Sequence, residues 1–290
     1  MALRLLSVLA HPDDESLAIG GVLARYAAEG VETHLLTATS GEQGWLGPPE
    51  KRPAAQELAR VREAELRAAG ELLGVRGLRL LRYPDGGLAA DDGGLIAAIA
   101  QAVRQIRPQV VVTFGPDGAT GHPDHIAISQ ATAGALLCAA DPAYDTGAGE
   151  EPHRVAKLYY LAPTRAKLDA YDRAFGDSAM TIDGLRRDVP GWPEWSVSAS
   201  ISSRPYAQQV WRAICCHRSQ LPRLDAAAEL PPATREALAS VTTFYRVYSL
   251  VDTGLPHEID LFAGLRQQEL KPLEGRQSAV PDRASGGRRE

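Results

Sequence analysis

Apolar residues along most of this chain alternate between short continuous runs and stretches with helical spacing. The short runs, rich in Leu and Val, are typical of strands buried on both faces of a sheet; they cover residues 3–9, 31–38, 78–81, 110–114 and 157–161. The stretches with helical spacing cover residues 16–29, 54–73, 94–106 and 125–140. Strands that alternate with helices predict an α/β fold, a Rossmann-like three-layer sandwich with a mostly parallel sheet.

The pattern weakens in the C-terminal third of the chain. Residues 163–204 show little periodicity, whereas residues 205–217 have helical spacing and residues 241–251 are typical of a late strand. We therefore expect one domain over residues 1–265, with a small irregular C-terminal part. Residues 266–290 contain Pro, Gly, Ser and Arg with few apolar residues, which predicts a disordered tail.

Clusters of His and carboxylate side chains follow two of the predicted strands. Residues 11–15 read HPDDE directly after the first strand, and residues 121–125 read GHPDH soon after the fourth. Taken alone, each cluster is also typical of the capped N-terminus of a helix. In a doubly wound sheet, however, the first and fourth strands are neighbours with a crevice above them, so the clusters are expected to meet. Together they offer the ligand set of a catalytic metal with an open position.

These two motifs resemble those of the PIG-L/LmbE-like zinc-dependent N-acetylglucosaminyl deacetylases. The resemblance rests mainly on AHPDDE at residues 10–15 and GHPDH at residues 121–125, with lesser matches at residues 39–42, 62–74, 83–86 and 217–220. It implies a zinc ion held by His11, Asp14 and His125. It further implies that Asp13 is the general base of the reaction.

The resemblance also assigns roles around the predicted ion. His122 is expected to face the developing oxyanion, with Asp124 orienting or charging its ring. Substrate contacts are expected from Glu42, Arg62, Asp85 and His217. Two of these have a competing interpretation, because Arg62 also fits a solvated helix face and His217 also fits a structural role.

The function implied is that of a metal-dependent hydrolase that removes the acetyl group from an N-acetylglucosamine-type substrate. One alternative is an amidase acting on thiol S-conjugates of a glucosaminyl thiol. Another is a non-catalytic Rossmann-like module that binds a sugar or nucleotide, although no Gly-x-Gly-x-x-Gly follows the first strand. Two His and one carboxylate also describe an Fe²⁺ site, so the residues alone leave the metal open.

Composition narrows the set of partners. A formal net charge of -5 and a pI of about 5.8 argue against nucleic acid, whose binding needs a concentrated basic surface. No apolar run reaches the length of a transmembrane helix, and the first strand begins too early for a leader segment, so we expect a cytoplasmic protein. The expected partner is a small amino sugar. The sequence leaves homo-oligomerisation open.

Overall fold

The computed structural model describes residues 2–147, 149–175, 180–182, 185–187, 189, 191–220 and 230–266. The strands are β1 (Arg4–Leu9), β2 (Glu32–Thr39), β3 (Gly77–Tyr83), β4 (Val110–Thr113), β5 (Lys157–Leu161), β6 (Met180–Ile182), β7 (Leu185–Arg187), β8 (Ala199–Ser202) and β9 (Val241–Ser249). The α-helices are α1 (Asp14–Ala28), α2 (Ala55–Leu72), α3 (Gly93–Ile106), α4 (Gly118–Gly121), α5 (Pro123–Ala140), α6 (Arg165–Phe175), α7 (Ala207–Ile214) and α9 (Pro232–Ala239). The short 3-10 helices are η1 (Pro49–Lys51), η2 (Glu194–Ser196) and η3 (Arg204–Tyr206). Apart from Arg266, the predicted tail lies outside the described residues.

A seven-stranded sheet with the order β3-β2-β1-β4-β5-β9-β8 forms the centre of the molecule. The strands β1 to β5 pair in parallel, while β9 pairs antiparallel with β5 and β8 antiparallel with β9. The predicted mostly parallel sheet is confirmed. The expected neighbourhood of the first and fourth strands is also confirmed, because β1 pairs with β4 from Leu5↔Val110 to Ser7↔Val112.

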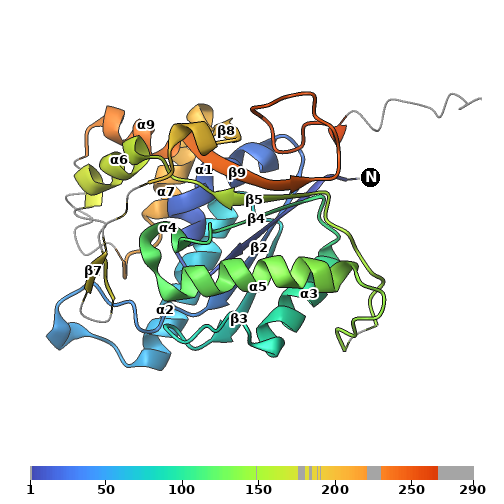
Figure 1. The fold of residues 1–290 in the computed structure, drawn as a ribbon. Helices are drawn as coiled ribbons and strands as arrows, with labels where there is room; N and C mark the ends of the chain where they lie inside the picture. The colour runs from blue at the N-terminus through green and yellow to red at the C-terminus, as the bar shows by residue number, and fades with distance from the viewer. Residues whose placement is uncertain are drawn as a thin grey trace, which may run out of the picture.

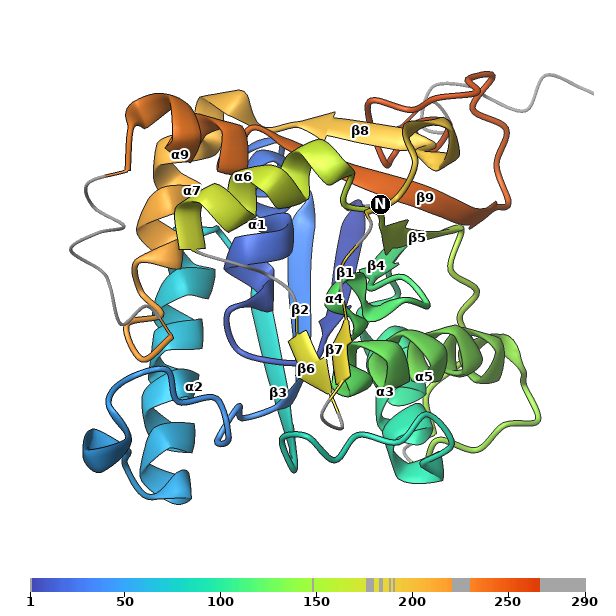
Figure 2. The ribbon, with the colours of Figure 1, turned by 60° about the vertical axis from the view of Figure 1, so that its left-hand side comes forward.

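Helices cover both faces of the sheet. Figure 1 shows α3 and α5 together on one side, and Figure 2 shows α1, α2 and α7 on the other. The second of these layers is held together by contacts of α7 with both α1 and α2. This arrangement is the predicted three-layer sandwich.

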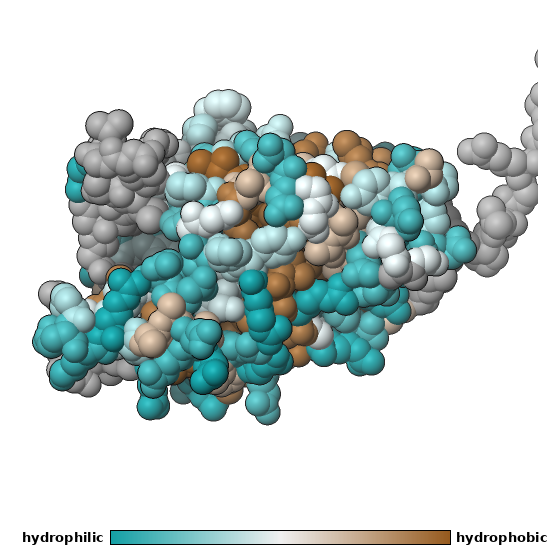
Figure 3. Space-filling model, turned by 90° about the horizontal axis from the view of Figure 1, so that it is seen from below, coloured by the Kyte–Doolittle hydropathy of each residue, from teal (hydrophilic) through white to brown (hydrophobic). Residues whose placement is uncertain are grey.

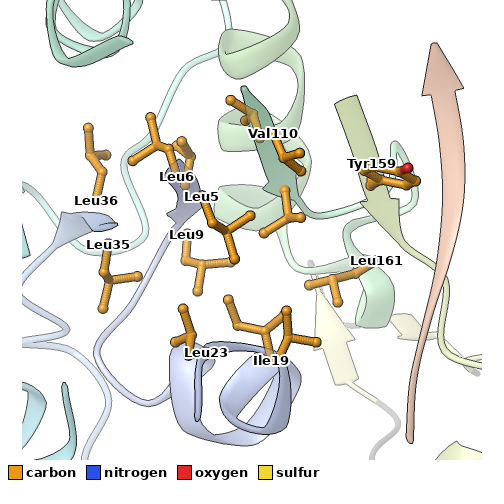
Figure 4. Packing of buried hydrophobic residues seen from close by; sticks show 14 of the residues in the cluster. Leu5, Leu6, Leu9, Ile19, Leu23, Leu35, Leu36, Val110, Tyr159 and Leu161 are labelled. Atoms are coloured by element: carbon orange, nitrogen blue, oxygen red, sulfur yellow. The ribbon is translucent and has the colours of Figure 1, made fainter. Parts of the chain in front are cut away.

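The core lies between these layers and explains why the strands read as continuous apolar runs. All four residues of β4 are buried, as are five of the six in β1. Figure 4 shows Leu5, Leu6 and Leu9 of β1 pointing to both sides, with Ile19 and Leu23 of α1 packed below them. A strand between two helical layers has no solvent face, so polar and apolar positions do not alternate along it.

The structure contains elements that the sequence pattern did not predict. The helix α6 and the strand β8 lie in the segment 163–204, for which we expected little regular structure. The short edge strand β8 pairs with β9 and forms one isolated bridge to Glu258, so long-range partners stabilise it. The helix α6 is short, and its buried apolar positions, Leu168 and Ala170, are few. Short elements of this kind give a weak periodic signal.

Among the described residues, no helix is both long and apolar enough to cross a membrane.

Figure 3 shows one face of the molecule, on which apolar residues form a band across the middle and hydrophilic residues surround it.

Candidate metal centre

The first elbow connects β1 to α1 through a strained turn. Asp13, the residue before α1, has φ 114° and ψ -28°, a backbone conformation that non-glycine residues rarely adopt. Asp14 folds back over the turn, since its Oδ2 accepts hydrogen bonds from the backbone N–H of Ala10 at 3.2 Å and of His11 at 2.8 Å. Strain of this kind persists only where surrounding contacts hold it, and it concentrates at functional sites.

The second elbow joins β4 to α5 and presents two imidazoles. His122 caps α5, and its Nδ1 accepts a hydrogen bond from the backbone N–H of Asp124 at 3.1 Å. In the neutral ring this places the proton on Nε2. His125 stacks on Phe114 with ring centroids 3.9 Å apart, and its Nδ1 lies 3.0 Å from the carbonyl oxygen of Gly118. Both contacts fix the ring and leave Nε2 of His125 facing the first elbow.

Three predicted ligands converge where the elbows meet. Nδ1 of His11 lies 3.2 Å from Nε2 of His125. In the Asp14 carboxylate, Oδ1 lies 3.5 Å from Nε2 of His125 and Oδ2 lies 3.8 Å from Nδ1 of His11. Ligands at about 2.0–2.1 Å from a tetrahedral ion are separated by about 3.4 Å. The donor atoms therefore fit a shared divalent ion.

Other donor sets overlap with the predicted one. Among the described residues, ligand atoms of His11, His122 and His125 lie within 4.8 Å of one another, as do those of His11, Asp85 and Asp124. The first set differs from the predicted one by His122 in place of Asp14. The ring centroid of His122 is 4.7 Å from that of His11 and 4.8 Å from that of His125. His122 thus borders the same space, and the assignment of ligands stays a prediction.

The ring of His11 is held from its other side by two carboxylates. Nε2 of His11 lies 3.1 Å from Oδ2 of Asp124 and 3.1 Å from Oδ1 of Asp85. Burial lowers the pKa of His11, but the hydrogen bonds to Asp124 and Asp85 outweigh burial and raise this pKa to about 10. Metal-ligating His residues commonly donate their second ring N–H to a carboxylate. The surroundings of His11 therefore favour positive charge.

The contacts of the Asp124 carboxylate differ from those we predicted. We expected its carboxylate to orient the His122 ring, but its described hydrogen bonds go to His11 and to the backbone N–H of Gly86 (2.8 Å) and Leu88 (3.1 Å). Its charge still acts on His122 through space and raises the pKa of that ring, although burial and the nearby His11 lower this pKa overall. The reason is their spacing of two positions at the start of α5, because residues two apart on a helix do not face each other.

Arg62 is not on a solvated helix face, so that interpretation was wrong. Its side chain is 3% exposed and lies on the buried stripe of α2 together with Leu58 and Leu66, four residues to either side. The guanidinium donates to Oδ2 of Asp13 at 3.2 Å, to the carbonyl oxygen of Gly41 at 2.8 Å and to that of Pro12. Burial raises the pKa of Asp13 to about 6, although Arg62 opposes this shift. The four-residue spacing was the signal that could have placed Arg62 inside.

The loops after β2 and β3 are tied to each other through Glu42 and Asp85. Oε1 of Glu42 accepts from the backbone N–H of Asp85 at 2.9 Å, and Oδ2 of Asp85 accepts from the backbone N–H of Gln43 at 2.8 Å. Burial opposes ionisation of Asp85, but the hydrogen bond from His11, the charge of His11 and the hydrogen bond from the Gln43 backbone together outweigh burial and lower the pKa of Asp85 to about 2. Asp85 is thus in direct contact with His11, a predicted metal ligand, in addition to its predicted role in substrate binding.

His217 lies behind the first elbow, in contact with Glu15. Its side chain is 2% exposed, and its Nε2 lies 2.7 Å from Oε1 of Glu15. The other carboxylate oxygen of Glu15 accepts the backbone N–H of Asp13 at 3.0 Å. Burial lowers the pKa of His217, but the charge of Glu15, the hydrogen bond to Glu15 and the charge of Asp13 together outweigh burial and raise this pKa. Sequence reasoning gave Glu15 no role at the site beyond a helix start, and the long separation from His217 gave no local signal.

The fold and the site define a class: Rossmann-like α/β proteins with a cluster of imidazoles and carboxylates at the carboxyl ends of adjacent parallel strands. Residues 6–136 match the model of the PIG-L family, described as GlcNAc-PI de-N-acetylase. The chain is 36% identical over 292 residues to a protein of Streptomyces griseus named 1D-myo-inositol 2-acetamido-2-deoxy-alpha-D-glucopyranoside deacetylase, covering 91% of this chain and 89% of that one. The chain therefore belongs to the PIG-L family, as its motifs predicted.

Solved structures share the fold of this chain. A conserved protein from Thermus thermophilus superposes with a TM-score of 0.61 at 28% identity, covering 87% of this chain and 98% of that one. The N,N'-diacetylchitobiose deacetylase from Pyrococcus horikoshii shares the fold, with a TM-score of 0.65 at 19% identity over 85% of this chain and 84% of that one.

Proposed function

We propose that this protein is a zinc-dependent N-deacetylase that removes the acetyl group from an N-acetylglucosamine-type substrate. The observation that supports this most strongly is the convergence of His11, Asp14 and His125 from two elbows more than a hundred positions apart. The names of the relatives support the choice of substrate, because they describe deacetylases of an N-acetylated amino sugar.

The three proposed ligands fit a divalent ion in both spacing and chemistry. Two neutral imidazole nitrogens and one carboxylate oxygen are a common protein ligand set for catalytic zinc. A divalent ion with an open coordination position supplies an activated water and polarises a carbonyl group. The hydrogen bonds from His11 to Asp85 and Asp124 and from His125 to Gly118 would hold the rings in the orientation that ligation requires.

The residues next to the ligands would move the protons. Asp13 is 17% exposed at its side chain, so a water molecule can reach its carboxylate, and Arg62 fixes the direction of that carboxylate. We assign Asp13 as the base that accepts a proton from the attacking water. His122, protonated on Nε2, would donate to the carbonyl oxygen as negative charge develops there.

The predicted substrate contacts divide into two groups by position. Glu42 and Asp85 lie on the loops that border the site, and we assign them to the sugar side. Arg62 and His217 are buried and hold the elbow of Asp13, so we assign both as positioning residues.

Metal analysis of purified variants tests the ligands. Wild-type protein should contain about one zinc per chain, and His11→Ala, Asp14→Ala and His125→Ala should each lose most of it. His257→Ala is the matched control, because His257 is exposed and its hydrogen bond within the described part of the chain goes to the backbone of Val197. Full metal content in the His11→Ala and His125→Ala proteins would contradict the proposed centre.

Amine release tests the reaction and the base. The protein should deacetylate an N-acetylglucosaminide far faster than an N-acetylated peptide or acetamide, because only the sugar can use contacts away from the amide. Asp13→Asn should keep the metal and lower kcat by about 10²- to 10⁴-fold. Equal efficiencies on all three substrates would contradict the choice of substrate, and near-normal turnover by the Asp13→Asn protein would place the base elsewhere.

A further inference from the structure

An apolar cavity of about 250 Å³ opens beside two of the proposed metal ligands. Asp14 and His125 form part of its wall, and the remainder comes from α1, the region after β4, helix α6 and the start of β9. Figures 1 and 2 both place α6 next to α1, and the hydroxyl of Tyr171 on α6 donates to the carbonyl oxygen of Leu17 on α1. The cavity is therefore created by a helix that the sequence pattern did not predict.

Three polar side chains of the cavity wall, Lys167, Tyr171 and Thr243, donate hydrogen bonds to the backbone. The ammonium group of Lys167 donates to the carbonyl oxygens of Leu238 and Val241. The hydroxyl of Thr243 donates to the carbonyl oxygen of Ala162 at 2.6 Å. Together with Tyr171, these side chains present methyl, methylene and ring surfaces to the cavity. A sugar, whose hydroxyl groups need hydrogen-bond partners when they leave water, is poorly suited to such a wall.

The cavity lies where the acyl group of an amide would be placed if the carbonyl group of the amide were held at the metal centre. The cavity touches Asp14 and His125, which face Nδ1 of His11, whereas Asp85 lies at Nε2 on the other side of the ring. The carboxylates of the sugar side and the apolar cavity are thus on different sides of His11. When the carbonyl group lies at the ligands, the two substituents of the amide point in different directions, one toward each region.

We propose that this cavity receives the acyl chain, and that the protein hydrolyses N-acyl amino sugars whose acyl group is longer than acetyl. The inference rests on the proposed function and extends it to a class of substrate. An apolar cavity of about 150 Å³ holds benzene, so 250 Å³ leaves room for more than about six carbon atoms, whereas acetyl offers one methyl group. The reaction remains hydrolysis: water gives its oxygen to the acyl carbon and both of its protons to the nitrogen as the C–N bond breaks, releasing a carboxylate and an ammonium group.

A series of N-acyl glucosamines from acetyl to decanoyl tests the proposal. Each methylene buried in the cavity should raise kcat/KM by about two- to fourfold until the cavity is full, near six to eight carbons. A parallel series keeps the N-acetyl group and lengthens an alkyl aglycone instead. Efficiency that rises only in the acyl series is expected. A flat acyl series, or a rise confined to the aglycone series, would overturn the assignment.

Filling the cavity gives a second, independent measurement. Ala18 lines the cavity and is half-buried on α1, so Ala18→Leu should shorten the optimal acyl chain and lower octanoyl turnover far more than acetyl turnover. Ala28→Leu is the matched control, since Ala28 is exposed at the end of the same helix. Loss of octanoyl turnover by about tenfold in the first variant alone is expected. An unchanged chain-length profile in the Ala18→Leu protein would overturn the proposal.

Calorimetry with hexanoate and acetate separates this proposal from the proposed function. Hexanoate should bind at least about tenfold more tightly than acetate, and Ala18→Leu should remove the difference. Protein that deacetylates N-acetylglucosaminides but binds both carboxylates equally would retain the proposed function and overturn the acyl cavity. Tight hexanoate binding without any amide hydrolysis would support the cavity and contradict the proposed function.

Discussion

Replacement of Arg62 tests how the strained elbow is maintained. In Arg62→Met, the Asp13 carboxylate loses its partner at 3.2 Å, and the carbonyl oxygens of Gly41 and Pro12 lose their donor. Removing one partner of a buried ion pair costs about 3–5 kcal/mol. Because the Asp13 side chain is 17% exposed and can gain some hydration, we expect a loss at the lower end, about 3 kcal/mol.

The same substitution should reduce catalysis without removing the metal. The ligands are untouched, but the Asp13 carboxylate would no longer be fixed in one direction, and a misplaced base lowers kcat by about 10- to 100-fold. Arg62→Lys should recover only part of this loss, since an ammonium group cannot reproduce the planar fork that reaches three acceptors. Urea denaturation, zinc analysis and kcat on an N-acetylglucosaminide measure the three quantities separately.

The control for Arg62 lies on the same helix. Arg67 is 55% exposed at its side chain and pairs with Glu63 at 2.7 Å. An exposed pair contributes about 0–1 kcal/mol, so Arg67→Met should be nearly neutral in stability and in kcat. An Arg62→Met protein within about 1 kcal/mol of wild type, with normal kcat, would show that the guanidinium does not hold the elbow.

Two further substitutions test the packing around the site and the C-terminal segment. A Cβ on Gly44 would lie 2.3 Å from the buried Arg62 guanidinium, so Gly44→Ala should lower the free energy of unfolding by about 1–3 kcal/mol and also lower kcat. Gly93→Ala is the control, because Gly93 has open space around it, and it should be nearly neutral in both assays. Lys157 and Glu258 are fully buried and 2.7 Å apart, and Glu258 also contacts Arg246 at 3.0 Å, so Lys157→Met should lower the free energy of unfolding by about 1–3 kcal/mol in urea denaturation. The double variant with Glu258→Gln should lose less than Lys157→Met alone; an equal or larger loss would show that the lost partner of the Glu258 carboxylate is not the cause.

The sequence alone determined the class of fold and the residues that meet at the centre. Alternating strands and helices required a parallel sheet, and parallel strands place the residues that follow them at one edge. His11 and His125 could therefore be predicted to meet, because each follows a strand in a short motif. These features are local in the chain, and the geometry of a doubly wound sheet converts local positions into spatial ones.

Only the tertiary structure decided what surrounds those residues. The carboxylate of Asp124 reaches His11 from 113 positions away, and His217 reaches Glu15 across 202 positions. Both contacts depend on loops and helix ends whose conformations follow no period in the sequence. Arg62 shows the same limit on a helix, because the pattern reveals a charged residue, whereas packing decides whether its charge faces solvent or a buried carboxylate. The apolar cavity arises likewise where α6 closes over α1, since its shape is set by the relative placement of distant elements and not by any one of them.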